Sequence, residues 1–90
     1  MDVDIEMILK PEEVKNSEAI INQIDAFINS FNLNSEIKDR EDGVIHNWKR
    51  SLEENILLYE IDIGSAGFVF LKKVLRYLSK LNCFLKVEVS

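Results

Sequence analysis

The residues of this chain that could do chemistry are few and lie far apart. His46 is its one histidine and Cys83 its one cysteine. A zinc site built on them would need carboxylates to complete its ligand set, and a Cys–His nucleophile pair has no local motif behind it. We therefore predict no catalytic site, no metal site and no cofactor, and we interpret Cys83 as a small buried hydrophobic residue.

The segment Gly64–Gly67, with the sequence Gly-Ser-Ala-Gly, raises the question of a phosphate-binding loop. Two glycines between an apolar run and a helical pattern meet the minimum for such a loop. The lysine and hydroxyl residue of a nucleoside-triphosphate loop are missing, because Phe68 and Val69 follow the second glycine. We interpret the segment as a short connection from a strand to a helix, with Ser65 as the helix cap.

Acidic residues form the first candidate binding surface. Asp2, Asp4 and Glu6 alternate with apolar residues, so that a strand would project all three to one side. Glu12 and Glu13 follow shortly after. The sum of their fields would attract a basic protein.

Two further candidates lie in the second half of the chain. Trp48 stands beside Lys49 and Arg50, a composition found in binding hot spots, and it is equally plausible as a core residue. Lys72, Arg76 and Lys80 are four residues apart and would stack on one face of a helix. This basic stripe is either a solvated face beside acidic neighbours or a site for an anionic partner.

The composition sets the broad class. Ninety residues, 47% hydrophobic and 30% charged, predict a single domain over residues 1–90. The net charge is −5, and residues 1–42 carry eleven acidic and four basic side chains. Such a protein repels nucleic acid, so we expect a protein partner, and a basic one. With no long apolar run, an acidic N-terminal sequence and a lone cysteine, we expect a cytoplasmic protein without a membrane partner.

Hydrophobic periodicity predicts the elements that must position these residues. Period-two patterns indicate strands at residues 3–9 and 85–89, and helical spacing indicates helices at residues 17–31 and 68–81. The nearly continuous apolar run at residues 56–63 indicates a central strand whose start is covered on both faces. Residues 35–40 form at best a short edge strand. Residues 44–54 fit either a strand that forms a hairpin with the next one, which we favour slightly, or a helix capped by Asp42. The expected core includes Ile24, Phe27, Leu58, Leu71 and Leu75.

The order of elements gives an α+β fold. With a strand at residues 44–54 it is βαββαβ, the ferredoxin-like arrangement, with two helices on one face of a four-stranded sheet. With a helix there it becomes βααβαβ, a barstar-like arrangement with a three-stranded parallel sheet.

Two families share features with this chain. The C-terminal third, residues 62–90, resembles the effector-associated constant-component domains of bacterial conflict systems, in which a Gly-Ser-rich connection precedes a leucine-patterned helix and a Val-rich terminal strand. That resemblance implies a self-associating adaptor. The size, the acidity and the ending "CFLKVEVS" are similar to barstar-type nuclease inhibitors. No functional residue is carried over from either family.

Three hypotheses about function follow. The first is a non-enzymatic immunity or inhibitor protein that masks a basic toxin or effector. The second is an adaptor or regulatory domain of a bacterial conflict system that self-associates, for instance as a homodimer. The third is a small-ligand sensor of ferredoxin-like type that binds at residues 64–67.

Overall fold

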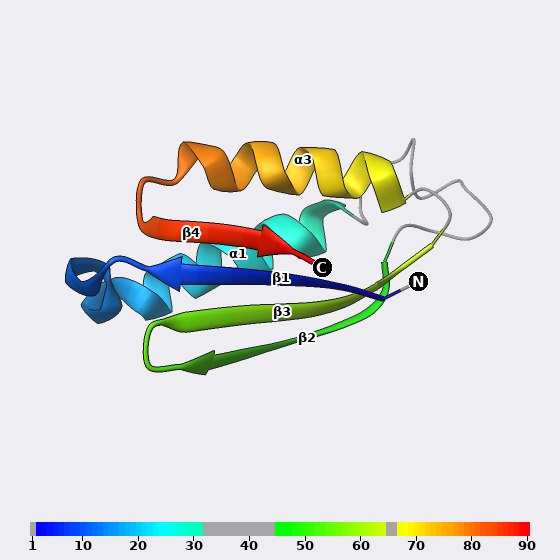
Figure 1. Cartoon of the computed structure of the whole chain (residues 1–90). Coiled ribbons are helices and arrows are strands. Elements are labelled where there is room, and N and C mark those ends of the chain that lie inside the picture. Colours follow the sequence, from blue (N-terminus) through cyan, green and yellow to red (C-terminus); the bar gives the residue numbers. More distant parts are fainter. Residues whose placement is uncertain (1, 32–44, 65–66) are drawn as a thin grey trace.

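The computed structural model of the chain describes residues 2–31, 45–64 and 67–90. Figure 1 shows how the elements of these ranges are arranged. They are, in chain order, β1 (Asp2–Leu9), the 3-10 helix η1 (Pro11–Asn16), α1 (Ser17–Phe31), β2 (Ile45–Glu53), β3 (Ile56–Ile63), α3 (Gly67–Lys80) and β4 (Phe84–Val89). The short strand considered at residues 35–40 lies outside the described residues.

The four strands form one antiparallel sheet in the order β2-β3-β1-β4. Residues 45–53 are therefore a strand, and the barstar-like alternative with a helix there and a parallel sheet is wrong. The reason is local. β2 and β3 are joined at Glu54 and Asn55 into a hairpin, in which Trp48 lies opposite Ile61, and β-branched and aromatic residues pack well across such a pair.

Burial alternates along the two central strands, so that one face of the sheet carries the core. Val3, Ile5, Met7 and Leu9 of β1 are buried, and so are the odd-numbered residues of β3 from Leu57 to Ile63. Because successive strand residues point to opposite faces, all these side chains share one face. Both helices supply the other half of the same core. The helical residues buried in it are Ile20, Ile24, Ile28, Phe70, Val74 and Leu78.

The first helix forms much as its sequence indicates. Pro11 ends the strand pairing of β1 and begins η1, where its missing N–H removes no hydrogen bond. α1 follows at Ser17 and has Glu18 in its first turn, where a carboxylate suits the helix dipole. Ile20, Ile24 and Ile28, spaced by four, then line the side that faces the sheet.

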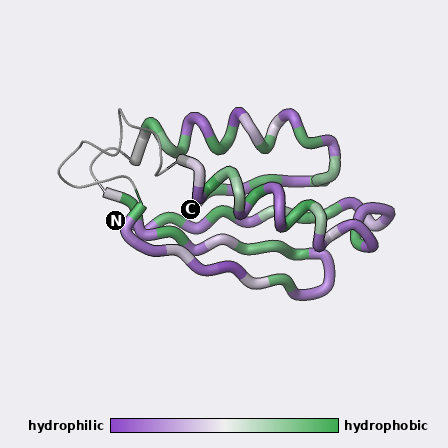
Figure 2. Tube along the Cα trace, turned by 180° about the vertical axis from the view of Figure 1, so that it is seen from behind, coloured by the Kyte–Doolittle hydropathy of each residue, from purple (hydrophilic) through white to green (hydrophobic). Residues whose placement is uncertain are grey.

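The second long helix, α3, differs from our prediction chiefly at Leu75, which we expected in the core. Its buried residues are Phe70, Val74 and Leu78, whereas Leu75 is 40% exposed and Leu71 is only partly buried. The apolar residues cover so wide an arc of this helix that the sequence alone allowed several rotations. In the observed rotation Tyr77 stacks on Phe27 of α1, with ring centroids 4.3 Å apart. Figure 2 shows hydrophobic and hydrophilic residues alternating along both helices.

The opposite face of the sheet, which we call the open face, has no element of the described chain packed on it. We expected the start of β3 to be covered on both sides. Instead Leu58 is only partly buried and Ile56 is 41% exposed. The connections β1–α1–β2 and β3–α3–β4 place both helices on the same side, and this leaves the even-numbered residues of β1 and β3 facing outward.

Candidate functional site

Carboxylates gather on the open face. Asp2, Asp4 and Glu6 project from it as predicted, because their odd-numbered neighbours in β1 are buried on the other side. The register brings three further acids beside them, since Asp62 lies opposite Asp2, Glu60 opposite Asp4 and Glu88 opposite Glu6. We call these six residues the acidic face. Only pairing between distant strands joins them, so the sequence alone did not reveal the last three.

These acids stand unusually close for like charges. Asp4 and Ser90 exchange two backbone hydrogen bonds of 2.9 Å, so the peptide groups of Asp4 point toward β4. Asp4 therefore makes no backbone hydrogen bond to its partner on the other side, Glu60 of β3. In such a non-hydrogen-bonded pair the Cα atoms approach to about 4.5 Å and the side chains lie closest. Like charges in such a pair destabilise a sheet.

Two lysines partly neutralise the acidic face. Lys49 of β2 lies 3.7 Å from Glu60, and Lys86 lies 2.7 Å from Glu88. The hydrogen bond and charge of Glu88, with Glu6 nearby, raise the pKa of the Lys86 ammonium group. Among the described residues of this face, six carboxylates thus stand against two ammonium groups.

The acidic face is also hollowed. An open hollow of about 480 Å³ lies over β1, β2 and β3. Its charged and polar lining residues are Asp2, Asp4, Asn47, Lys49, Glu60 and Asp62. Such a hollow could receive a basic side chain of a partner, since its walls carry four carboxylates and one ammonium group. Among the described residues, no three His, Cys, Asp or Glu side chains are grouped so that they could hold a metal ion.

An apolar patch adjoins the acidic face at the other end of the same strands. Ile8 lies opposite Ile56, and Leu58 lies opposite Glu6. All three apolar side chains are on the open face and are at least partly accessible. Lys86 faces Ile8 from β4, and Ser51 faces Leu58 from β2, so a polar rim borders the patch. An apolar centre with a charged border is the usual anatomy of a protein–protein interface.

The remaining predicted binding residues lie elsewhere. Glu12 and Glu13 belong to η1, beyond the Leu9 end of β1. At about 3.3 Å per residue, Asp2 is about 23 Å and Glu6 about 10 Å from that end, so Glu12 and Glu13 lie beyond the acidic face. Trp48 projects to the helix-covered side, where its ring lies 5.7 Å from that of Tyr59. Lys72, Arg76 and Lys80 are exposed on α3, in the helical layer.

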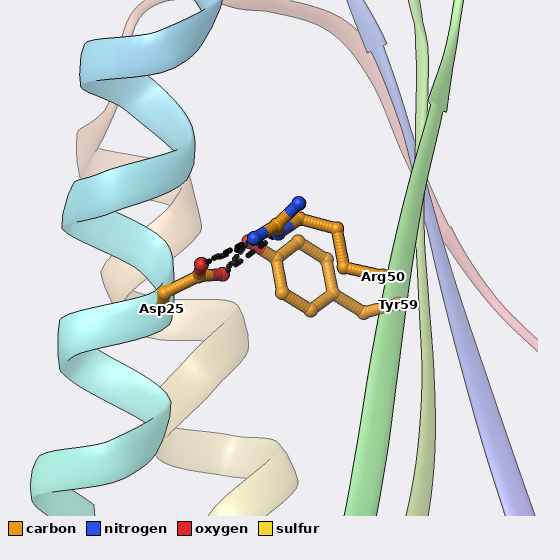
Figure 3. Close-up of polar contacts among 3 residues, drawn as sticks. All are labelled: Asp25, Arg50 and Tyr59. Atoms are coloured by element: carbon orange, nitrogen blue, oxygen red, sulfur yellow. Dashed lines mark hydrogen bonds and ion pairs between the residues drawn. The ribbon is translucent and has the colours of Figure 1, made fainter.

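A polar cluster that we did not predict connects α1 to the sheet (Figure 3). Asp25 of α1 accepts a hydrogen bond of 2.6 Å from the Tyr59 hydroxyl. It also receives a bidentate contact from Arg50 of β2, with bonds of 2.9 and 3.2 Å. Burial of the Tyr59 ring, together with its bond to Asp25, raises the pKa of the phenol well above its usual range. All three polar groups have partners, so we interpret this cluster as a structural link between the helical layer and the sheet.

The residues with potential chemistry are not brought together. His46 is exposed in the irregular start of β2, near Ile63 and Asp62 of β3. Cys83 is buried beside Lys10, past the opposite end of β1, and burial raises the pKa of its thiol. β3 ends at Ile63 and α3 begins at Gly67, so the glycine segment does join a strand to a helix. Ser65 and its proposed capping role lie outside the described residues.

Two observations about the whole chain complete the description. No helix in the described ranges is long and apolar enough to cross a membrane. Comparison of the sequence with protein-family models and with curated proteins, and of the structure with solved structures, found no match.

Proposed function

We propose that this chain is a non-enzymatic protein-binding domain whose open sheet face binds a basic protein. The observation that carries the proposal is the acidic face, with six carboxylates and two lysines, beside the apolar patch of Ile8, Ile56 and Leu58. Placing Asp4 opposite Glu60 works against the stability of the sheet. Local arrangements that oppose folding are expected where a protein has a functional reason to keep them.

The two parts of this surface would serve different steps of binding. The carboxylates would draw a basic partner into contact and raise the association rate. The apolar patch would then be buried under the partner and slow its dissociation, because desolvated apolar anchors carry most of the binding energy. An immunity or inhibitor protein needs both steps, since it must find a basic toxin or effector quickly and keep its surface masked. We place this activity in the cytoplasm.

We further propose that the fold is the ferredoxin-like one. The strand order β2-β3-β1-β4, with every neighbouring pair antiparallel and both helices contributing to one core, supports this assignment. In such a fold the sheet face away from the helices is free to receive a partner. This is the face on which the acids gather here.

The test uses two variants with the same change in net charge. In the face variant, Asp4→Lys and Glu60→Lys reverse two charges of the acidic face. In the control variant, Glu12→Lys and Glu13→Lys do the same on η1, at the far end of β1. Each chain is immobilised and exposed to an extract of its source cells, and the captured proteins are quantified by mass spectrometry. A basic protein should be captured by the wild type and the control and lost from the face variant.

The kinetics of the purified pair then separate the two parts of the surface. The face variant should lower the association rate about tenfold or more at low salt and flatten its salt dependence. Leu58→Ala should act on the dissociation rate instead. Equal losses in both charge variants would mean that only net charge matters. If reversal of Lys72, Arg76 and Lys80 were the one change that abolished binding, the basic stripe of α3 would be the site and the proposal would fail.

A further inference from the structure

Among the described residues, β4 is an edge strand of the sheet and pairs with β1 alone. Ser90 exchanges backbone hydrogen bonds with Asp4 of β1. Because the direction of the peptide groups alternates along a strand, the N–H and C=O groups of Glu88 and Lys86 also point toward β1. Val87 and Val89 must then direct their N–H and C=O groups away from the sheet. A row of outward donors and acceptors is a template for another strand.

The side chains along this edge are apolar on the helix-covered side. Leu85 is 63% exposed and Val89 is 41% exposed. Leu75 of α3 adds to this row. It lies about 200° around the helix from Tyr77, at 3.6 residues per turn, and Tyr77 contacts α1, so Leu75 faces away from α1 and toward the β4 side. Three of the exposed large apolar side chains thus gather along one edge.

On the open face, the same edge carries a charge pair of opposite sign. Lys86 and Glu88 project to that face and lie 2.7 Å apart. A lysine alone on an edge strand prevents association, because two copies would repel each other. With a glutamate two residues further on, the repulsion can become attraction in one particular register.

We propose that two copies of this chain pair through β4 as antiparallel strands, with the two-fold axis at Val87. Val87 lies opposite Val87 of the second copy, and their outward peptide groups form two hydrogen bonds. Lys86 lies opposite Glu88 of the second copy, twice by symmetry. These are non-hydrogen-bonded positions, where side chains come closest. On the other face, Leu85 lies against Val89 of the second copy.

The charges select this register over its neighbours. An axis at Lys86 would place lysine opposite lysine, and an axis at Glu88 would place glutamate opposite glutamate. Like charges in direct opposition are unfavourable. The register centred on Val87 pairs opposite charges and aligns the apolar side chains.

The other edge of the sheet, β2, does not have these properties. It bears polar residues on both faces, among them Asn47, Lys49, Arg50 and Ser51. Of the apolar residues of β2, only Leu52 counts among the exposed large ones. Of the two edge strands, β4 is therefore the better supported as the site of self-association.

This inference does not rest on the proposed function. An edge-to-edge dimer with its axis perpendicular to the sheet would form one eight-stranded sheet, with both acidic faces on the same side. It would fit an inhibitor of a dimeric partner or a self-associating adaptor equally well.

The experiment measures the monomer–dimer equilibrium of purified full-length chains by sedimentation equilibrium, from about 10 μM to about 1 mM, the range in which a weak dimer is detected. Lys86→Glu places glutamate opposite Glu88 of the second copy and should weaken the dimer about tenfold or more. The double variant Lys86→Glu/Glu88→Lys exchanges the two charges and should restore the wild-type dissociation constant. Lys15→Glu, on the exposed η1, is the control with the same change in net charge as the single variant.

A second pair of variants tests the backbone of the edge. Val87→Pro removes an outward N–H that β1 does not use and should abolish the dimer, whereas Val87→Ala shortens the side chain alone and should weaken it less. Circular dichroism of each variant checks that the monomer is folded. A wild type that stays monomeric throughout the concentration range would overturn the proposal. So would a dimer that survives both Lys86→Glu and Val87→Pro, or a charge exchange that fails to restore dimerisation in a folded chain.

Discussion

The carboxylate of Asp25 lies 2.6 Å from the hydroxyl of Tyr59, and this short contact joins α1 to the centre of the sheet. The tyrosine is 1% exposed, whereas Asp25 is reached by solvent from one side, where Arg50 closes over it. The hydroxyl of a buried tyrosine needs a partner. Asp25 is thus fixed in position by two residues of two different strands.

Tyr59→Phe should lower the free energy of unfolding by about 1–3 kcal/mol, because it removes a hydrogen bond to a charged acceptor. Arg50→Ala should cost less, about 1 kcal/mol or below, because the guanidinium is partly solvated and its ion pair is screened. Urea denaturation measures both. Tyr77→Phe is the control, since the Tyr77 ring is stacked on Phe27 and its loss of a hydroxyl leaves that stacking in place. Equal effects of the two tyrosine variants would contradict the importance of the bond to Asp25.

The same tyrosine predicts a loss of stability in alkali. Its pKa is raised in the folded chain, so its proton is held there and released more readily from the unfolded chain, where the pKa is about 10. The contribution is complete below pH of about 10 and is lost as pH rises beyond it, by up to about 1.4 kcal/mol per pH unit. Unfolding measured between neutral pH and pH of about 11 should show a shallower decline for Tyr59→Phe than for the wild type. Parallel curves would refute this assignment.

Relief of the like-charge pair on the acidic face should stabilise the fold. Asp4→Asn leaves Glu60 without an opposing carboxylate and should raise the free energy of unfolding by about 0.2–1 kcal/mol at low salt. The gain should shrink at about 1 M salt, where charges are screened within about 3 Å. Glu12→Gln, on η1, makes the same change in charge away from this pair and serves as the control. A gain that did not depend on salt would point to a cause other than repulsion.

The two neighbouring turns of α3 should respond very differently to truncation. Leu78→Ala removes a fully packed side chain and should cost about 2–5 kcal/mol. Leu75→Ala should cost less than about 1 kcal/mol, because Leu75 already meets solvent. The comparison is made at low protein concentration, where the chain is monomeric. Similar losses at both positions would show that the helix has the rotation we first predicted.

The hairpin between β2 and β3 has a residue that suits it poorly. Glu54 has a φ of 56°, in the left-handed region that a residue with a Cβ adopts at a cost of about 1–2 kcal/mol. Glu54→Gly removes that steric cost and should stabilise the chain by up to about 1 kcal/mol. Glu54→Ala keeps the Cβ and should give no such gain. Thermal unfolding of the two variants separates the backbone effect from the loss of the charge.

How far the sequence could be interpreted depended on whether the relevant contacts are local. The alternation in residues 3–9, the apolar run of residues 56–63 and the isoleucine spacing of α1 were enough to predict these elements, since each pattern lies within one element. The exposure of Leu75 on α3 could not be predicted, because apolar residues surround much of this helix and its packing involves residues distant in sequence, such as Phe27. The same holds for the acidic face. Asp2, Asp4 and Glu6 were visible as a local pattern, whereas Glu60, Asp62 and Glu88 join them through strand pairing alone.

The position of β1 in the sheet constrains the order in which the protein can fold during synthesis. β1 leaves the ribosome first, but both of its neighbours, β3 and β4, come from the second half of the chain. Until they emerge, neither neighbouring strand covers β1, and of the elements described before β2 it is η1 and α1 that can shield its apolar residues, Val3, Ile5, Met7 and Leu9. Contacts this distant in sequence slow folding, because a long loop must close before they form. The nascent chain therefore exposes the core side chains of β1 until β3 and β4 have been made, the stage at which a chaperone would have a reason to bind it.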